Sequence, residues 1–250
     1  MALYRLEAKM ISRSAGRTAT AAAAYRAGEL IEDARTGLVF DFRARNYGTD
    51  GELKAANDRE IMHTEILMPQ HAPSRLKDRS KLWNEAELAE RRKDAQTARE
   101  ILLALPHELS QDGRIELVRR FVQEQFVDQY GVAADIAVHA PDKKGDQRNF
   151  HAHVLLTTRG ITEDGFTAKK LREMNATNQL EAWREEWAKH QNRELEKRGH
   201  EKVDHRSYAD QGSSKLPGVH LGPEASAMSR YGVESFLEAS NDELGEVNKR

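Results

Sequence analysis

Apolar and polar side chains alternate with a period of two along several stretches of the chain, a pattern that predicts β-strands. The clearest stretch alternates Phe150, Ala152, Val154 and Leu156 with His151, His153, Thr157 and Arg159. The same period predicts further strands over residues 3–11, 37–43, 60–68, 98–105 and 133–140. Each predicted strand therefore has one face suited to a core and one polar face.

Apolar spacings of three and four predict helices over residues 18–31, 82–92, 111–130 and 171–198. Ser110 and Gly131 supply the start and stop signals of the third helix. Strands that pair as hairpins, with helices between them, predict an α+β fold with a central antiparallel sheet covered by helices. The polar faces of the strands that carry Glu100, His139 and His153 should line one side of that sheet.

Composition narrows the class of protein. The 250 residues include no cysteine, which excludes disulfides and thiolate chemistry and fits a reducing compartment. The sequence shows no signal peptide and no apolar run of transmembrane length, so we expect a cytoplasmic protein with no membrane partner. The net charge is only −2, so bulk charge does not indicate a nucleic-acid-binding protein.

Three histidines form a candidate metal site. His151 and His153 lie on one strand face, about 6.6 Å apart along the strand. His139 has the matching parity on the preceding strand, and a turn-rich link over residues 141–146 allows the two strands to pair as a hairpin. Such a site would hold a divalent ion, for which we expect Mn²⁺ or Mg²⁺, although ligand softness leaves Zn²⁺ and Ni²⁺ open. The alternative is a set of histidines on a half-exposed strand.

A local run of cations indicates a phosphate-binding surface. Residues 8–28 contain no acid and carry Lys9, Arg13, Arg17 and Arg26. Arg159, on the polar side of the histidine strand, is a fifth candidate contact. A basic patch on a nearly neutral protein can still bind the phosphates of a nucleic acid. The alternative is that these cations belong to an ordinary solvated surface.

Several motifs occur together. They are the strand Ala2–Leu6, the loop Ser12–Gly16, Tyr25 in an alanine-rich helix, and His139 ahead of the run Asn149–His153. The stretch 216–223, Leu-Pro-Gly-Val-His-Leu-Gly-Pro, is another. Together they resemble the MobA/MobL (MobQ-type) conjugative relaxases over about the first 223 residues. We therefore expect a relaxase domain at 1–223, followed by a polar segment at 224–250 that leads into a longer protein.

The resemblance implies an HUH-type endonuclease with a palm-like antiparallel sheet, which nicks one strand of plasmid DNA at the origin of transfer. It implies that Tyr25 attacks the scissile phosphate and keeps the 5′ end as a phosphotyrosine. It also implies that His139, His151 and His153 bind the metal, with Glu100 acting as a base or as a helper of the ligands. The implied partners are single-stranded origin DNA, accessory relaxosome proteins and a coupling protein.

Other functions remain open from the residues alone. A rolling-circle replication initiator or a transposase of the same class would share the site. A metal-dependent hydrolase of a small phosphoester would use Tyr25 only to anchor a helix, and a DNA-binding adaptor would leave the histidines inert. A covalent protein–DNA adduct separates the first pair from the other two.

Overall fold

The computed structural model describes residues 2–55, 59–143, 145–219, 221–222, 224–225, 228 and 231–248. Its strands are β1 Leu6–Ser12, β2 Leu30–Glu32, β3 Val39–Asp41, β4 Ile61–Leu67, β5 Gln96–Ala104, β6 Ala134–His139, β7 His151–Thr157, β8 Arg159–Thr162 and β9 Gly165–Lys170. Its α-helices are α1 Ala19–Ala27, α2 Arg79–Leu88, α3 Gln111–Val122, α4 Asp128–Tyr130, α5 Thr177–Glu196 and α7 Phe236–Val247. The 3₁₀ turns are η1 Arg13–Ala15, η2 Arg43–Arg45, η4 Ser74–Lys77 and η6 Arg172–Asn175, and the π-helical turn η5 spans Gln123–Val127.

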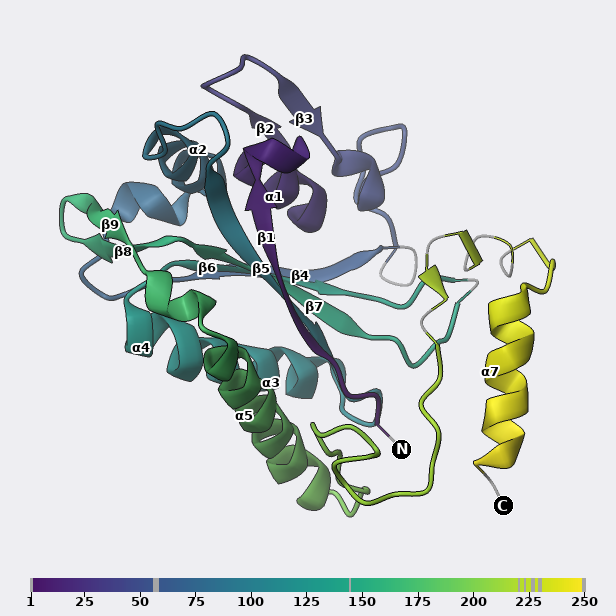
Figure 1. Cartoon of the computed structure of the whole chain (residues 1–250). Coiled ribbons are helices and arrows are strands. Elements are labelled where there is room, and N and C mark those ends of the chain that lie inside the picture. The colour runs from purple at the N-terminus through teal and green to yellow at the C-terminus, as the bar shows by residue number, and fades with distance from the viewer. Residues whose placement is uncertain are drawn as a thin grey trace.

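The centre of the molecule is a five-stranded sheet in the order β1-β5-β7-β6-β4, in which every neighbouring pair is antiparallel. Helices α3 and α5 cover one face of this sheet, and α1 and α2 lie on the other (Figure 1). The predicted α+β class with a central antiparallel sheet is confirmed. Two small hairpins, β2–β3 and β8–β9, stand outside the main sheet.

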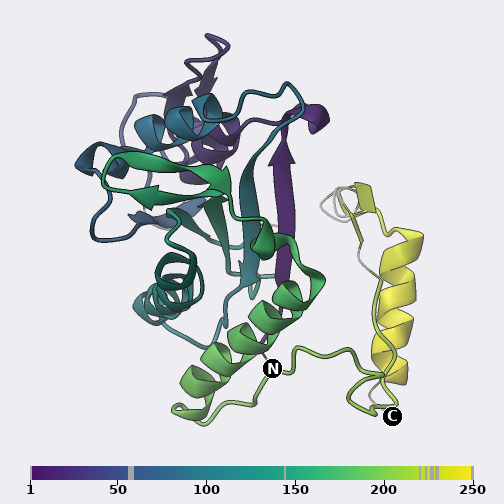
Figure 2. The same cartoon turned by 60° about the vertical axis from the view of Figure 1, so that its left-hand side comes forward.

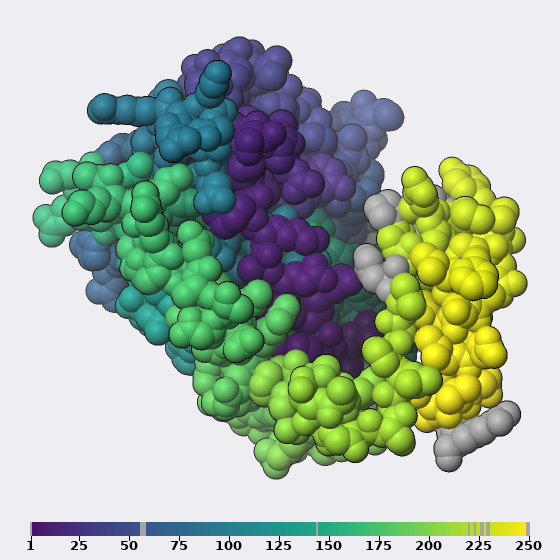
Figure 3. Space-filling model, in the orientation of Figure 1, coloured from purple at the N-terminus to yellow at the C-terminus, as the bar shows by residue number. Residues whose placement is uncertain are grey.

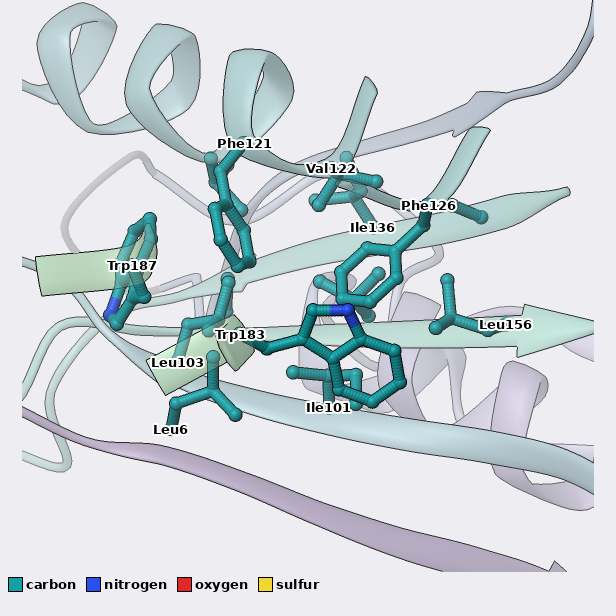
Figure 4. Packing of buried hydrophobic residues seen from close by; sticks show 14 of the residues in the cluster. Leu6, Ile101, Leu103, Phe121, Val122, Phe126, Ile136, Leu156, Trp183 and Trp187 are labelled. Atoms are coloured by element: carbon teal, nitrogen blue, oxygen red, sulfur yellow. The ribbon is translucent and has the colours of Figure 1, made fainter. Parts of the chain in front are cut away.

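The face under α3 and α5 is apolar. Ile101, Leu103, Ile136 and Leu156 come from the strands and are fully buried. Figure 4 shows Phe121, Trp183 and Trp187 of the covering helices packed over them. Burial of such side chains contributes roughly 1.5–3 kcal/mol each, so this face supplies much of the driving force for folding.

Helix α1 is fixed at both ends. The Thr18 hydroxyl accepts a hydrogen bond from the Ala21 amide, and a carboxylate oxygen of Glu87 accepts one from the Ala19 amide at 2.6 Å. Gly28 ends the helix with φ of 66°, a left-handed conformation that favours glycine, and a Cβ there would lie 2.7 Å from Cδ1 of Ile61. Because both ends are held, the side chains of α1 have a fixed relation to the sheet.

Several predicted elements are wrong at their ends. The predicted helix 18–31 stops at Ala27, because Gly28 terminates it and residues 30–32 pair with β3 instead. In the predicted helix 171–198, residues 172–175 form the 3₁₀ turn η6 and only Thr177–Glu196 is α-helical. Helix α2 starts at Arg79, where Asp78 caps it, three residues before the predicted start.

Other elements were not predicted at all. The sequence pattern does not predict the hairpin β8–β9, and helix α7 lies in the segment that is expected only to be polar. Figure 2 shows α7 standing apart from the sheet and its covering helices. Lys144 of the predicted turn, and His220 and Pro223 of the predicted family motif, lie outside the described residues.

The strand β1 forms one edge of the sheet. In Figure 3 its purple surface runs between the green chain of β8, β9 and α5 and the yellow C-terminal segment. In the described part of the chain, no helix combines the length and apolar character needed to cross a bilayer.

Candidate metal and nucleophile site

The three histidines come from adjacent strands and meet on the polar face of the sheet. His139 of β6 pairs directly with His151 of β7, and His153 lies two residues further along β7. Their ring centroids are 4.8–5.3 Å apart. The hairpin that the sequence predicted therefore brings all three rings together.

Each imidazole donates one N–H to a fixed acceptor. Nδ1 of His153 donates to Glu100 at 2.7 Å, and Nδ1 of His151 donates to the Asn149 carbonyl at 2.9 Å. Nε2 of His139 donates to the Arg26 carbonyl at 2.8 Å. The other nitrogen of each ring is left as a possible ligand, as in metal sites where a second hydrogen bond orients the histidine.

The donor set fits a metal ion. One nitrogen from each of the three rings can be chosen so that all lie within 4.8 Å of one another, so small rotations of the rings would bring them to the roughly 3.4 Å that separates tetrahedral nitrogen ligands of one ion. Burial is the largest cause that lowers the pKa of all three imidazoles, to about 2 for His139 and about 4 for His151. The rings are thus neutral near pH 7, the state in which imidazole binds a metal.

Glu100 is a buried carboxylate on β5 that lies between His153 and α1. Its Oε1 accepts hydrogen bonds from Nδ1 of His153 at 2.7 Å and from Nε of Arg26 at 2.6 Å. Burial raises the pKa of Glu100, but the bonds from His153 and Arg26 outweigh it and bring the pKa to about 2. The carboxylate is therefore ionised and connects the histidine cluster to the helix that carries Tyr25.

Tyr25 lies in the last turn of α1, beside this cluster. The next residue, Arg26, bonds to His139 through its carbonyl and to Glu100 through its side chain. The Tyr25 side chain is 42% exposed, and its ring packs edge-on against Phe42 with centroids 5.1 Å apart. The helix thus holds Tyr25 next to a residue that bonds directly to the site, while leaving the tyrosine accessible to a substrate.

Arg45, which no sequence pattern indicated, places its guanidinium carbon 4.2 Å from the centroid of the Tyr25 ring. It stands 20 residues after Tyr25, in a loop segment without a periodic pattern. Arg45 reaches α1 only because the β2–β3 hairpin and η2 fold back toward that helix. No local sequence signal could therefore have identified it.

The structure separates the predicted phosphate-binding residues into two groups. Arg26 lies in the site, Lys9 is exposed on β1 directly opposite Glu100, and Arg17 is exposed just before α1. Arg13 and Arg159 instead form ion pairs with Glu87 and Glu90, with side chains 7% and 15% exposed.

Arg159 also lines a groove of about 950 Å³ between the loop that precedes β5 and the segment that joins β9 to η6. Arg99, Lys169 and Arg172 line the same groove. These residues form a second basic surface, away from the three rings.

Known proteins resemble this chain over most of its length. The MobA/MobL family matches residues 17–231. The mobilization protein MobL of Acidithiobacillus ferridurans is 37% identical over 92% of this chain and 64% of its own length. The conjugal transfer protein TraA of Agrobacterium fabrum is 32% identical over the whole chain and 24% of its own length.

A solved structure from a study of vancomycin resistance transfer in Staphylococcus aureus superposes with a TM-score of 0.69 at 30% identity. It covers 83% of this chain and 100% of its own. The chain spans about two thirds of MobL and about a quarter of TraA, so it corresponds to one part of these relatives. With a family match over residues 17–231 and relatives above 30% identity, the chain belongs to the MobA/MobL family.

Proposed function

We propose that this chain is a relaxase that nicks one strand of plasmid DNA at the origin of transfer and stays attached to the 5′ end. The observation that supports this most directly is the hydrogen bond from His139 to the Arg26 carbonyl. It fixes the turn of α1 that carries Tyr25 against a three-histidine cluster suited to a metal ion. A nucleophile and a phosphate-activating site are thus held side by side.

In the proposed reaction, Oη of Tyr25 forms a bond to the scissile phosphorus and loses its proton. The bond between phosphorus and the 3′ oxygen breaks, and the 3′ oxygen takes up a proton. The product is a 5′-phosphotyrosine, so the phosphodiester energy is kept in the protein–DNA link.

His139, His151 and His153 would hold a divalent ion, and we propose Mn²⁺ or Mg²⁺. When bound, such an ion supplies Lewis-acid stabilisation of the charge that develops on the phosphate. The pKa of Glu100, about 2, suits an ionised carboxylate that orients His153 better than a base that accepts a proton at pH 7. We therefore assign Glu100 the role of ligand helper.

We assign phosphate contacts to Lys9, Arg17 and Arg26, because these cations are exposed or lie in the site. Arg13 and Arg159 form ion pairs with Glu87 and Glu90, so we assign them no phosphate contact. We also propose that relaxosome accessory proteins and a coupling protein act on the longer protein, whose relaxase domain would span residues 1–223. We also propose that the protein acts in the cytoplasm.

The test uses single-stranded origin DNA labelled at either the 5′ or the 3′ side of the nick. With Mn²⁺, we expect the label on the 3′ side of the nick to run with the protein on a denaturing gel, because that fragment carries the 5′ phosphate. Chelator should abolish the band. Cleavage without any protein-linked product would show that water is the nucleophile and would overturn the proposal. Equal cleavage of an origin of replication would favour an initiator.

A further inference from the structure

Two arginine guanidinium groups contact the Tyr25 ring. The guanidinium carbon of Arg45 lies 4.2 Å from the ring centroid, and that of Arg26 lies 4.9 Å from it. Phe42 contacts the ring edge-on with centroids 5.1 Å apart. A guanidinium within about 6 Å of an aromatic centroid is attracted by the ring quadrupole, so these contacts restrict how the ring can turn.

Arg45 is itself held at two points. Its Nη1 donates to the Tyr25 carbonyl at 2.6 Å, and its Nε donates to Glu60 at 2.7 Å. Its side chain is only 16% exposed. The planar fork of arginine can make both hydrogen bonds while its face stays on the ring, a combination that lysine cannot reproduce.

Arg45 is also connected to the histidine cluster through the backbone of α1. Its Nη1 donates to the Tyr25 carbonyl, and the carbonyl of the next residue, Arg26, accepts a hydrogen bond from Nε2 of His139 at 2.8 Å. One guanidinium thus contacts the turn of α1 that carries Tyr25 and that also bonds to the histidines.

We propose that Arg45 is a positioning residue for cleavage, which fixes the ring and backbone of Tyr25 relative to the histidines. This inference rests on the proposed function, in which Tyr25 is the nucleophile. Misplacing a reacting group by about 1 Å can cost about a hundredfold in rate. Loss of Arg45 should therefore slow the chemical step much more than it weakens DNA binding.

The experiment compares Arg45→Ala with Arg43→Ala on full-length protein. Arg43 is the matched control, since it begins the same turn, η2, but its side chain is 56% exposed and paired with Asp41. Single-turnover cleavage of origin DNA gives the rate constant, and fluorescence anisotropy gives the DNA affinity. We expect the rate of Arg45→Ala to fall about a hundredfold with affinity within about threefold of the wild type, whereas Arg43→Ala keeps its rate.

Two further measurements separate positioning from a loss of folding. Added ethylguanidinium should partly restore the rate of Arg45→Ala and leave Arg43→Ala unchanged, because it replaces the missing planar cation. Glu60→Gln, which weakens only the anchor of Arg45, should lower the rate by less than Arg45→Ala does. Thermal melting checks that each variant is folded.

The outcomes distinguish the inference from the function on which it rests. If the wild type forms no covalent adduct, the proposed function fails. If the wild type forms the adduct and folded Arg45→Ala forms it at the same rate, only the role of Arg45 is overturned. A rate loss that Arg45→Lys restores in full would also overturn it, because charge alone would then suffice.

Discussion

The two faces of the central sheet are buried in different ways. On the face under α3 and α5, Ile101 and Ile136 pack among apolar side chains that make no directional bonds. On the face under α1 and α2, Glu100, Asp135 and His139 are also almost fully buried, yet each has specific hydrogen-bonding partners. Burial alone therefore does not distinguish scaffold from site, whereas the kind of partner does.

The polar face is itself divided. Asp135 and His139 point to the same side of β6, four residues apart. The Asp135 carboxylate accepts hydrogen bonds from Nε of Arg79 and from the indole N–H of Trp83, at 2.8 Å each. His139 instead belongs to the three-histidine cluster, in which each ring offers one nitrogen to a metal ion, beside the helix turn that carries the exposed Tyr25. One end of the strand thus uses polar groups for stability, and the other end keeps them available for chemistry.

The largest expected effect comes from Tyr25, the proposed nucleophile. Tyr25→Phe removes only the hydroxyl, so metal binding and DNA affinity should stay near those of the wild type while covalent adduct formation is lost. The matched control is Tyr47→Phe, a tyrosine of similar exposure outside α1. Adduct formation by Tyr25→Phe at the wild-type rate would show that another tyrosine reacts.

The second prediction concerns the histidine end of the polar face. Replacement of both His151 and His153 with Ala should abolish metal-dependent cleavage and reduce Mn²⁺ binding, measured by calorimetry. The fold should persist, because the sheet is held by its apolar face. Retained cleavage in this double variant would refute the metal site.

The third prediction concerns the other end of the same face. Asp135→Ala leaves buried Arg79 with Glu29 as its remaining partner and removes the acceptor of the Trp83 indole, so it should lower the free energy of unfolding by about 3 kcal/mol. Chemical denaturation measures this loss. If Asp135→Ala were as stable as the wild type, the distinction between the two ends of β6 would be lost.

Sequence pattern predicted this division only in part. The period of two fixed which face each histidine occupies, and hairpin pairing then placed His139 opposite His151. The partners of these groups could not be predicted, because Arg26 reaches Glu100 across 74 residues and Arg45 reaches Tyr25 across 20. Such contacts depend on how α1 and η2 dock, which no local pattern encodes.

The missed elements, in contrast, carried local signals. The β8–β9 hairpin carried a recognisable signal, since the polar residues Glu163 and Asp164 form its turn and are followed by Gly165, which pairs with Thr162 at φ of 133°. The end of α1 could also have been predicted from Gly28, because glycine commonly terminates helices. Helix α7 has a serine cap at Ser235 whose side chain accepts from the Glu238 amide. That start signal could therefore have been recognised in the sequence.

The fourth prediction uses pH to compare the two faces. Burial holds the folded-state pKa of His139 at about 2, against about 6.5 in an unfolded chain. The unfolded chain therefore takes up the proton first, so stability is full above pH 6.5 and is lost as the pH falls toward the folded value. For His139 this loss is about 1.4 kcal/mol per pH unit at most.

Urea denaturation with chelator at pH 7.0 and pH 5.5 measures that loss without competition from a metal. His139→Ala should make the pH dependence in this range shallower but not remove it, because His151 and His153 remain. Ile101→Ala should lower stability equally at both pH values, because it removes no titrating group. A wild-type stability independent of pH would contradict the assignment of neutral, buried imidazoles.

The smallest expected effect concerns the basic edge of the polar face. Lys9 and Arg17 are exposed, and Lys9 lies opposite Glu100 on the edge strand β1, where a DNA strand that approaches Tyr25 would pass. Each phosphate contact on single-stranded DNA contributes about −0.7 to the slope of log affinity against log salt. Replacing both residues with Ala should therefore make the slope shallower by about 1.4, as measured by anisotropy over a salt series. Lys189→Ala is the control, because Lys189 is exposed on α5 and that helix covers the opposite face of the sheet. An unchanged slope in the double variant, or an equal change in Lys189→Ala, would mean that the DNA does not follow β1.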